Sequence, residues 1–329
     1  MRLALACLLL LAAPSQAQPQ AAQIQAAQTH AFVTNQGDDT VSVVDTATGA
    51  VTQTVSVGSK PAGIAVAADG RRVYVTNPEG RSISILDHSN GRLALLAEVP
   101  AGAGPLGVAV SPRDGGVFVA DWYGDTVAVL DPDGKPVAPA IKVGQSPSGL
   151  AIDPAGARLY AANRESDTLS VIDLANLATV ATVPVGHAPF GVTVQGGRVF
   201  VANVQSGDVS VLDAATLTEI RRLPVGEFPY AIGVSPDGSR IMVTNQHSGT
   251  LSVFDGAFTP LPDIAVGDYP EGIAMSADGT RAYVAVWMDN RLAEIDVAAG
   301  KVIRKIKVGE GPRAFGAFLA PLQDKDSVR

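Results

Sequence analysis

The chain has 329 residues and a formal net charge of −8, from 24 Lys and Arg against 32 Asp and Glu. An acidic surface repels phosphate backbones and no basic cluster interrupts it, so we predict no nucleic-acid partner. Hydrophobic residues make up 47% of the chain and aromatic residues only 5%, which is typical of strands and turns packed through small side chains.

The N-terminus has the features of a secretory signal peptide. Arg2 supplies a positive charge, residues 3–13 form an apolar run, and a small-residue cleavage motif ends at Ala17. The apolar run is much shorter than the roughly 20 residues that a transmembrane helix needs. We therefore predict a signal peptide at residues 1–17, no membrane span, and a periplasmic or secreted protein. Cleavage would remove Cys7, the single cysteine, and with it thiolate metal sites and disulfides.

After a Gln- and Ala-rich leader at residues 18–30, one pattern repeats to the end of the chain. It reads V-G-x-x-P-x-G, apolar strand, Asp-Gly turn, aromatic-V-T-N, polar loop and S-V-apolar-D. Its first glycine recurs every 40 to 44 residues, at Gly58, Gly102, Gly144, Gly186, Gly226, Gly267 and Gly309. A period of about 40 residues built from short strands is typical of a β-propeller blade. We predict one domain at residues 31–320, followed by a tail at residues 321–329.

Each repeat predicts four strands, which we call a to d from the inside of the ring outward. In the repeat that begins at Pro61, these are residues 63–67, 73–77, 82–86 and 93–99. The turn Ala68-Asp69-Gly70 joins the first two, because glycine supplies the positive φ that such turns need. Alternation at period two with regular turns predicts antiparallel sheets.

The two ends of the chain predict how the ring closes. The chain begins with strands b, c and d of one blade at residues 32–35, 41–44 and 51–57, and it ends with strand a at residues 314–319. The fold is therefore predicted as all-β, a seven-bladed propeller of four-stranded antiparallel blades, closed by pairing the N-terminal strands with the C-terminal strand. We number this joined blade 1, and blades 2 to 7 follow from Pro61.

Three repeats carry a recognisable four-residue motif, which reads YVTN at residues 74–77, FVTN at residues 32–35 and MVTN at residues 242–245. With these motifs the chain resembles the YVTN-repeat β-propeller family. The resemblance implies the propeller fold. It also implies several roles, since similar propellers include periplasmic binding proteins, surface-layer modules and subunits or partners of quinoprotein dehydrogenases.

Two polar positions recur in the repeats, and we interpret both as having a structural role in the fold. An aspartate ends strand c in every repeat and is expected to accept backbone hydrogen bonds in the c–d turn. These are Asp45, Asp87, Asp131, Asp173, Asp213, Asp255 and Asp296. An asparagine ends strand b in five repeats and is expected to satisfy the b–c loop backbone. These are Asn35, Asn77, Asn163, Asn203 and Asn245.

Both tryptophans lie in b–c loops where the repeat departs from its pattern. Blade 3 has Trp122 and Tyr123 after strand b, and blade 7 has Trp287. We take these three residues as candidates for ligand binding, the alternative being that they cover gaps between blades.

The residue that follows the proline of each d–a corner, just before the glycine position, also changes in a regular way around the ring. Blades 2 to 4 have Ala62, Leu106 and Ser148, whereas blades 5, 6, 7 and 1 have Phe190, Tyr230, Glu271 and Arg313. In such a blade the d–a corners and the b–c loops emerge on one face. The last four residues are therefore predicted to line one side of a channel mouth as a solvated rim that binds a ligand. The alternative is packing between blades.

No Ser-His-Asp, H-E-x-x-H, EF-hand or P-loop pattern appears, so we predict no catalytic residue and no metal ligand, and the sequence indicates no cofactor. The predicted function is binding of a small molecule or of a periplasmic partner protein, a redox enzyme among the candidates, by a monomer without catalysis.

Two kinds of enzyme and a structural role are the alternatives. A metal-dependent, lactonase-like hydrolase would need carboxylates such as Glu271, Asp289, Asp121 and Glu165 to meet at the mouth. A subunit or accessory of a quinoprotein dehydrogenase is the other enzymatic possibility. A structural surface protein is the third alternative.

Overall fold

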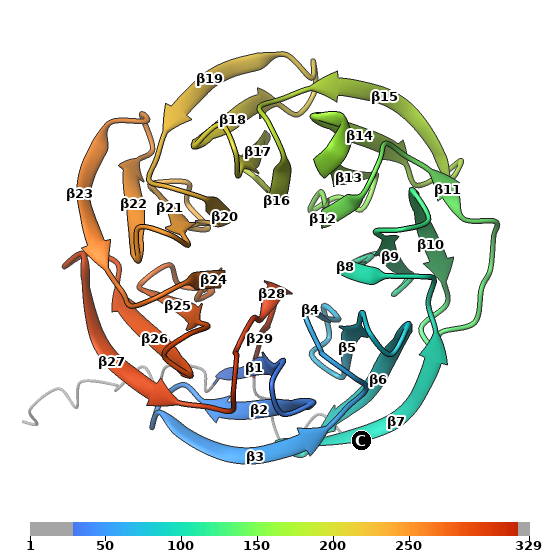
Figure 1. The fold of residues 1–329 in the computed structure, drawn as a ribbon, viewed down its shortest axis with the longest axis horizontal. Coiled ribbons are helices and arrows are strands. Elements are labelled where there is room, and N and C mark those ends of the chain that lie inside the picture. Colours follow the sequence, from blue (N-terminus) through green and yellow to red (C-terminus); the bar gives the residue numbers. More distant parts are fainter. Residues whose placement is uncertain (1–28, 322–329) are drawn as a thin grey trace, which may run out of the picture.

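The computed structural model describes residues 29–321, which form a ring of seven β-sheets around a central channel (Figure 1). Each sheet has four antiparallel strands, and the sheet of blade 2 carries a fifth. The predicted seven-bladed propeller is therefore confirmed. The described residues include one short 3-10 helix, η1 (Arg164–Ser166), and no helix long and apolar enough to cross a membrane.

The strands of each blade follow one another from the channel to the rim (Figure 1). The inner strands of blades 2 to 7 are β4 (Gly63–Val66), β8 (Pro105–Val110), β12 (Pro147–Ile152), β16 (Pro189–Gln195), β20 (Pro229–Val234) and β24 (Pro270–Met275). The second strands of blades 1 to 7 are β1 (Thr29–Asn35), β5 (Arg72–Asn77), β9 (Val117–Asp121), β13 (Arg158–Asn163), β17 (Arg198–Asn203), β21 (Arg240–Asn245) and β25 (Arg281–Val286).

The third strands are β2 (Thr40–Asp45), β6 (Ser82–Ser89), β10 (Thr126–Leu130), β14 (Thr168–Asp173), β18 (Asp208–Asp213), β22 (Thr250–Asp255) and β26 (Arg291–Asp296). The outer strands are β3 (Ala50–Ser56), β7 (Arg92–Pro100), β11 (Ile141–Lys142), β15 (Ala178–Pro184), β19 (Glu219–Pro224), β23 (Pro260–Ala265) and β27 (Lys301–Lys307). The second strands are buried on both faces, as in β5, because neighbouring blades cover both sides of each sheet.

The ring closes at blade 1, where the structure corrects the predicted C-terminal strand. We expected one strand at residues 314–319, but the segment divides into β28 (Phe315–Ala317) and β29 (Leu319–Pro321). β29 pairs antiparallel with β1 and completes blade 1, whereas β28 pairs in parallel with β4 of blade 2. Gly316 has a φ of 126° and approaches the carbonyl of Ile64, which lets the segment run between the two blades. Closure by pairing of the two chain ends is confirmed.

The predicted boundaries of the propeller differ slightly from those of the strands. β1 begins at Thr29, inside the predicted leader, and β29 ends at Pro321, inside the predicted tail. The predicted signal peptide lies outside the described residues.

The last glycine of the V-G-x-x-P-x-G corner is required by contact between blades. In five blades a Cβ at this position would lie within 3.0 Å of a carbonyl oxygen of the next blade, closer than real Cβ atoms approach. The five glycines are Gly63, Gly107, Gly149, Gly191 and Gly272, whereas blades 6 and 1 have Ala231 and Ala314 at this position. The sequence pattern marked these glycines as a repeat feature, and the close approach of backbones explains why a side chain is excluded there.

We expect Gly272→Ala to lower the free energy of unfolding by about 1–3 kcal/mol or more, the usual cost of forcing atoms into a packed interior. The new Cβ would overlap the backbone of Ala314 and Arg313 in blade 1, which cannot move without opening the ring. Urea unfolding measures the effect. Gly116→Ala is the matched control, because a Cβ there would lie 3.3 Å from one side-chain oxygen of Asp114. Equal stabilities of the two variants would contradict this account of the corner glycine.

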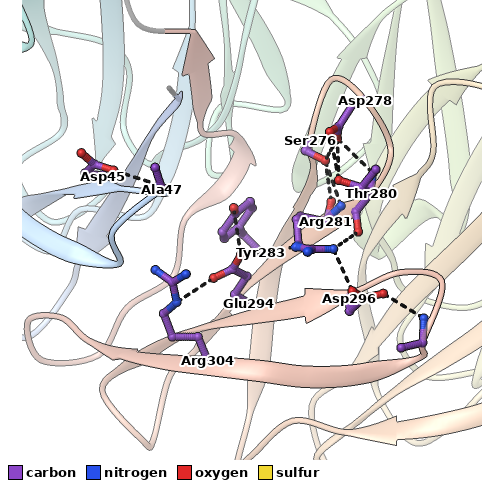
Figure 2. A network of polar contacts seen from close by, with 11 residues as sticks. Asp45, Ala47, Ser276, Asp278, Thr280, Arg281, Tyr283, Glu294, Asp296 and Arg304 are labelled. Atoms are coloured by element: carbon purple, nitrogen blue, oxygen red, sulfur yellow. Dashed lines mark hydrogen bonds and ion pairs between the residues drawn. The ribbon is translucent and has the colours of Figure 1, made fainter. Parts of the chain in front are cut away.

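The repeated aspartates do cap the c–d turns, as predicted. Asp45 accepts a hydrogen bond from the backbone N–H of Ala47 at 2.9 Å (Figure 2). It also accepts one from the backbone N–H of Thr48 at 3.0 Å. Asp131, Asp173, Asp213, Asp255 and Asp296 accept equivalent bonds. Asp87 is the exception, since it binds the side chains of Arg72 and Ser89 next to a longer c–d hairpin.

The repeated asparagines have a structural role, but their partners differ from our expectation. Each is fully buried, and its amide donates to two side chains of strand c instead of to the b–c loop. Asn77, for example, donates to the hydroxyls of Ser82 and Ser84, both at 3.0 Å. The asparagine also packs against the first corner glycine, Gly58, where a Cβ would collide with its amide. The motif V-T-N thus joins strand b to strand c and to the corner.

An acidic side chain is buried between blades 7 and 1. Glu294 lies opposite Tyr283 in the register of β25 and β26, where blade 1 has Val43 opposite Phe32. It is 3% exposed, and its carboxylate lies 3.1 Å from Nε of Arg304 (Figure 2). An ion pair therefore replaces an aliphatic contact at the seam where the ring closes.

A histidine pair is buried between blades 1 and 2. Nδ1 of His30 lies 3.0 Å from Nε2 of His88, and Nδ1 of His88 lies 2.8 Å from the carbonyl oxygen of Gly70. A carbonyl only accepts, so His88 donates from Nδ1, and its Nε2 then accepts from His30. Burial, together with the charge of His88, lowers the pKa of His30, against the opposing effect of Asp45.

We expect the protein to lose stability as the pH falls below about 6.5, the ordinary pKa of histidine. Because the pKa of His30 is lower in the folded than in the unfolded protein, the unfolded chain binds the proton more tightly, and acid favours unfolding. Urea midpoints measured from pH 7.5 to 5 test this. His30→Gln keeps a donor toward His88 and removes one titrating group, so its midpoint should fall less with acid. A decline as steep as that of the unmodified protein would contradict the assignment.

Candidate ligand-binding site at the channel mouth

The d–a corners and the b–c loops lie on one face, as expected, and we call it the corner face. Backbone hydrogen bonds join the two within each blade: the N–H of Trp122 donates to the carbonyl of Gly104, and that of Gln246 to Phe228, both at 2.9 Å. The inner strands run from this face toward the a–b turns. Between them lies a channel cavity of about 560 Å³, whose lining ends at a–b turn residues such as Pro236.

Three aromatic rings close the channel at the corner face, and we call them the aromatic plug. Phe190 stacks on Tyr230 with ring centroids 4.1 Å apart, and Phe315 lies 4.9 and 5.6 Å from these two rings. All three side chains are at most 6% exposed. Neither Phe190 nor Tyr230 belongs to the cavity lining, whereas Phe315 does. The alternative interpretation of the corner aromatics, packing between blades, therefore describes their contacts.

A buried ion pair joins blades 7 and 1 beside the plug. Nε of Arg313 donates to Oε2 of Glu271 at 2.6 Å, and its Nη2 donates to Oε1 at 3.0 Å. The same Nη2 donates to the hydroxyl of Tyr230 at 2.8 Å, and Gln246 adds a hydrogen bond to Oε1 of Glu271 at 3.0 Å. Glu271 is 3% exposed, so the expected solvated rim is wrong for this residue.

The charges of this pair fix the protonation of the mouth. Burial by itself would lower the pKa of Arg313, but the adjacent Glu271 carboxylate outweighs burial and raises it, so the guanidinium stays charged. Burial raises the pKa of the Tyr230 phenol well above its usual value. The mouth therefore contains a permanent cation and a protonated phenol at any physiological pH.

A second arginine, Arg164, lies beside the ring of Trp122. The guanidinium carbon of Arg164 is 5.9 Å from the ring centre of Trp122, within cation–π range. Trp122 in turn packs against the hydrophobic cluster that contains Phe190 and Tyr230. The carboxylate nearest to Arg164 is Glu165, with Oε1 3.6 Å from Nε.

The structure brings five of the seven predicted residues together: Trp122, Phe190, Tyr230, Glu271 and Arg313. Tyr123 is 76% exposed and lies over Gly104. Trp287 packs against Gly311, and its ring is 6.1 Å from Tyr269.

Trp287 belongs to a separate aromatic row on the rim. His247 stacks on Phe228 at 3.8 Å between centroids and lies 5.3 Å from Tyr269, which leads on to Trp287. Phe228 and Tyr269 have left-handed backbone, with φ of 56° and 58°, a conformation that bulky residues rarely adopt. The row gives the corner face an aromatic strip outside the mouth.

The sequence analysis missed three members of the site, Arg164, Gln246 and Phe315. Arg164 and Gln246 directly follow the asparagine that ends strand b, the same loop position as Trp122 and Trp287. The side chain at that position points toward the mouth in blades 3, 4 and 6. Arg164 and Gln246 could therefore have been predicted from their position in the repeat, which is the same as that of Trp122. Phe315 stands at the apolar strand-a position that holds Ile64 in blade 2 and Val108 in blade 3, so nothing in the repeat pattern distinguished it as a site residue.

A family model for YNCE-like β-propellers matches residues 2–193, more than half of the sequence. The chain belongs to the YNCE-like β-propeller family. This membership agrees with the blade pattern of the sequence and with the fold. No curated protein sequence matches the chain.

Solved structures share the fold of this YNCE-like propeller at low identity. A functionally unknown protein from Desulfotomaculum acetoxidans has a TM-score of 0.76 at 17% identity, covering 87% of this chain and 99% of that chain. Hydrazine synthase from Kuenenia stuttgartiensis has a TM-score of 0.72 at 21% identity, covering 81% and 92%. The periplasmic gluconolactonase of Pseudomonas aeruginosa has a TM-score of 0.75 at 21% identity, covering 90% and 99%. At such identities the similarity concerns the fold alone.

The four carboxylates named for a metal-dependent hydrolase do not form a ligand cluster. Asp121 accepts hydrogen bonds from the backbone N–H groups of Ala103 and Gly104 at 2.9 and 2.8 Å, and Glu271 is bound to Arg313. Residues 29–321 contain no group of three or more His, Cys, Asp or Glu side chains placed to hold a metal ion.

Proposed function

We propose that this propeller is a periplasmic or secreted binding protein that holds a small molecule at its mouth on the corner face and does not itself catalyse a reaction. In this proposal residues 1–17 are a signal peptide and the mature protein acts as a monomer. The finer relationship to YVTN-repeat propellers is part of the same proposal.

The main support for the proposal is that both carboxylate oxygens of Glu271 already accept hydrogen bonds. Both of its oxygens accept from Arg313, and Oε1 also accepts from Gln246, so this carboxylate is not poised to take a proton from water or substrate. Tyr230 stays protonated because burial raises its pKa. Hydrolysis needs a positioned base, and these mouth residues offer donors and ring surfaces instead.

The composition of the mouth also supports binding. It combines the aromatic plug, the ring of Trp122 beside Arg164, and the side chain of Arg313, which is 21% exposed. Apolar surface with a few polar groups is the usual lining of a small-molecule site.

A thermal-shift screen of the mature protein against metals, quinones, sugars, lactones and organic acids tests the proposal. A ligand at 100 times its Kd raises the free energy of unfolding by about 2.7 kcal/mol. A mouth ligand should give a much smaller shift with Trp122→Ala than with Trp287→Ala, which alters the rim. Equal shifts in both variants would place the site elsewhere.

A lactonase activity is the second candidate, because one structural neighbour is a periplasmic gluconolactonase. Lactones assayed with added Ca²⁺, Mg²⁺, Mn²⁺ or Zn²⁺ distinguish the two. Turnover that EDTA abolishes, and that Glu271→Gln lowers in a folded protein, would replace the binding-only function. A role as subunit or accessory of a quinoprotein dehydrogenase would instead show as binding to that enzyme.

A further inference from the structure

Two arginine side chains lie at the aromatic surface of the mouth. Nη2 of Arg313 donates to the hydroxyl of Tyr230 at 2.8 Å, and the guanidinium carbon of Arg164 lies 5.9 Å from the ring centre of Trp122. Their side chains are only 21% and 23% exposed. The mouth therefore carries two partly buried cations, in a protein whose net charge is −8.

Most of the donors on these two groups have no partner within residues 29–321. Arg313 uses Nε and Nη2, which leaves Nη1 without a hydrogen bond. The guanidinium of Arg164 makes no hydrogen bond with the described residues, and its contact with Glu165 is 3.6 Å long. Glu165 is itself 60% exposed, so solvent screens that contact.

A cation withdrawn from water is stabilised by an anion, and folded proteins pair such charges. Glu271 neutralises Arg313, but among the described residues Arg164 is paired only with the exposed Glu165. An anionic group of a ligand would neutralise Arg164 and accept hydrogen bonds from its open donors.

The ring of Trp122 indicates the shape of the ligand. It lies beside Arg164 and packs on the cluster that contains the plug, so a planar apolar body placed there would contact aromatic surface. Stacked rings favour flat partners, and the fork of a guanidinium matches the two oxygens of a carboxylate.

We infer that the mouth binds a small carboxylate with a planar, aromatic body: the carboxylate accepts from the guanidinium of Arg164, and the body lies against Trp122. This inference rests on the proposed function, since it names the ligand class of the same site. Arg164 is the residue that determines specificity, because Arg313 is already paired.

The test uses Trp122 fluorescence in a Trp287→Phe variant, which leaves Trp122 as the single tryptophan. Benzoate and indole-3-carboxylate are titrated beside benzamide and indole-3-carboxamide, which have the same shape without the charge. Acetate tests the need for the ring, and inorganic phosphate tests for general anion binding. We expect the carboxylates to bind about tenfold or more tightly than the amides, because hydrogen bonds to charged groups are the stronger ones.

Variants separate the role of Arg164 from general charge. Arg164→Gln should remove the preference for carboxylate over amide, whereas Arg92→Gln, on the exposed c–d hairpin of blade 2, should preserve it. Equal affinity for carboxylate and amide would overturn the inference while leaving the proposed binding function in place. Phosphate or acetate binding as tightly as the aromatic acids would also overturn it. If neither these probes nor any compound of the thermal-shift screen binds, the proposed function fails as well.

Discussion

A chain that ends at Arg313 is expected to lose its cooperative unfolding transition. The truncation removes β28 and β29, and with them the pairing of β1 with β29 and of β4 with β28. It also removes Phe315 and the fully buried Phe318, each worth about 1.5–3 kcal/mol of hydrophobic stabilisation. A loss of this size, added to an unpaired sheet edge, is large against a typical total stability of about 5–15 kcal/mol.

Calorimetry and size-exclusion chromatography measure this effect. The matched control ends at Pro321, so that it keeps both closing strands and loses only residues 322–329. We expect the control to melt in one sharp transition as a single species, and the shorter chain to aggregate or to melt without cooperativity. A soluble, sharply melting chain that ends at Arg313 would show that these strands do not close the ring.

Arg313→Ala should lower the free energy of unfolding by about 3–5 kcal/mol, the usual cost of removing one partner of a buried ion pair. The Glu271 carboxylate would remain 3% exposed without its main donor, next to the aromatic plug. The pair joins blade 7 to blade 1, so its loss also weakens the closing seam. This effect is far larger than the one expected for a solvated rim.

A double-mutant cycle measured by urea unfolding tests this pair. Arg313→Met combined with Glu271→Leu should cost much less than the sum of the two single changes, since no buried charge is then left alone. Arg222→Ala is the control: Arg222 is 40% exposed and is paired with Glu219 and, at 3.5 Å, with Asp208, so the change should cost less than about 1 kcal/mol. Additive effects at Arg313 and Glu271 would mean that the pair is solvated after all.

The sequence predicted the fold well because each blade repeats the same physical requirements. The corner glycines, the strand-b asparagines and the turn aspartates each meet a backbone or a neighbouring strand in the same way around the ring. The closing segment lacks such repetition. Its division at Gly316 depends on how two distant parts of the chain approach each other, and no local pattern encodes that approach.

The sequence predicted where the site residues lie, but it did not predict that they are buried. The corner residues Tyr230, Glu271 and Arg313 lie together because the repeat places them at equivalent points of adjacent blades. Their burial could not be predicted, since it depends on contacts between blades. Trp122 and Trp287 hold the same loop position, yet Trp122 packs against the hydrophobic cluster that contains the plug, whereas Trp287 packs against Gly311 of the neighbouring corner.

The central claim is that the mouth binds a ligand without converting it. The most direct test is NMR of a single sample in which the signals of the two indole N–H groups and those of the ligand are followed together. The chain has only two tryptophans, so Trp287→Phe assigns both signals. For an aromatic carboxylate that binds, the account predicts a saturable shift of the Trp122 signal, an unmoved Trp287 signal, and ligand resonances that stay chemically unchanged for hours. A shift confined to Trp287, or the replacement of ligand resonances by those of a product, would contradict a non-catalytic binding site at the mouth.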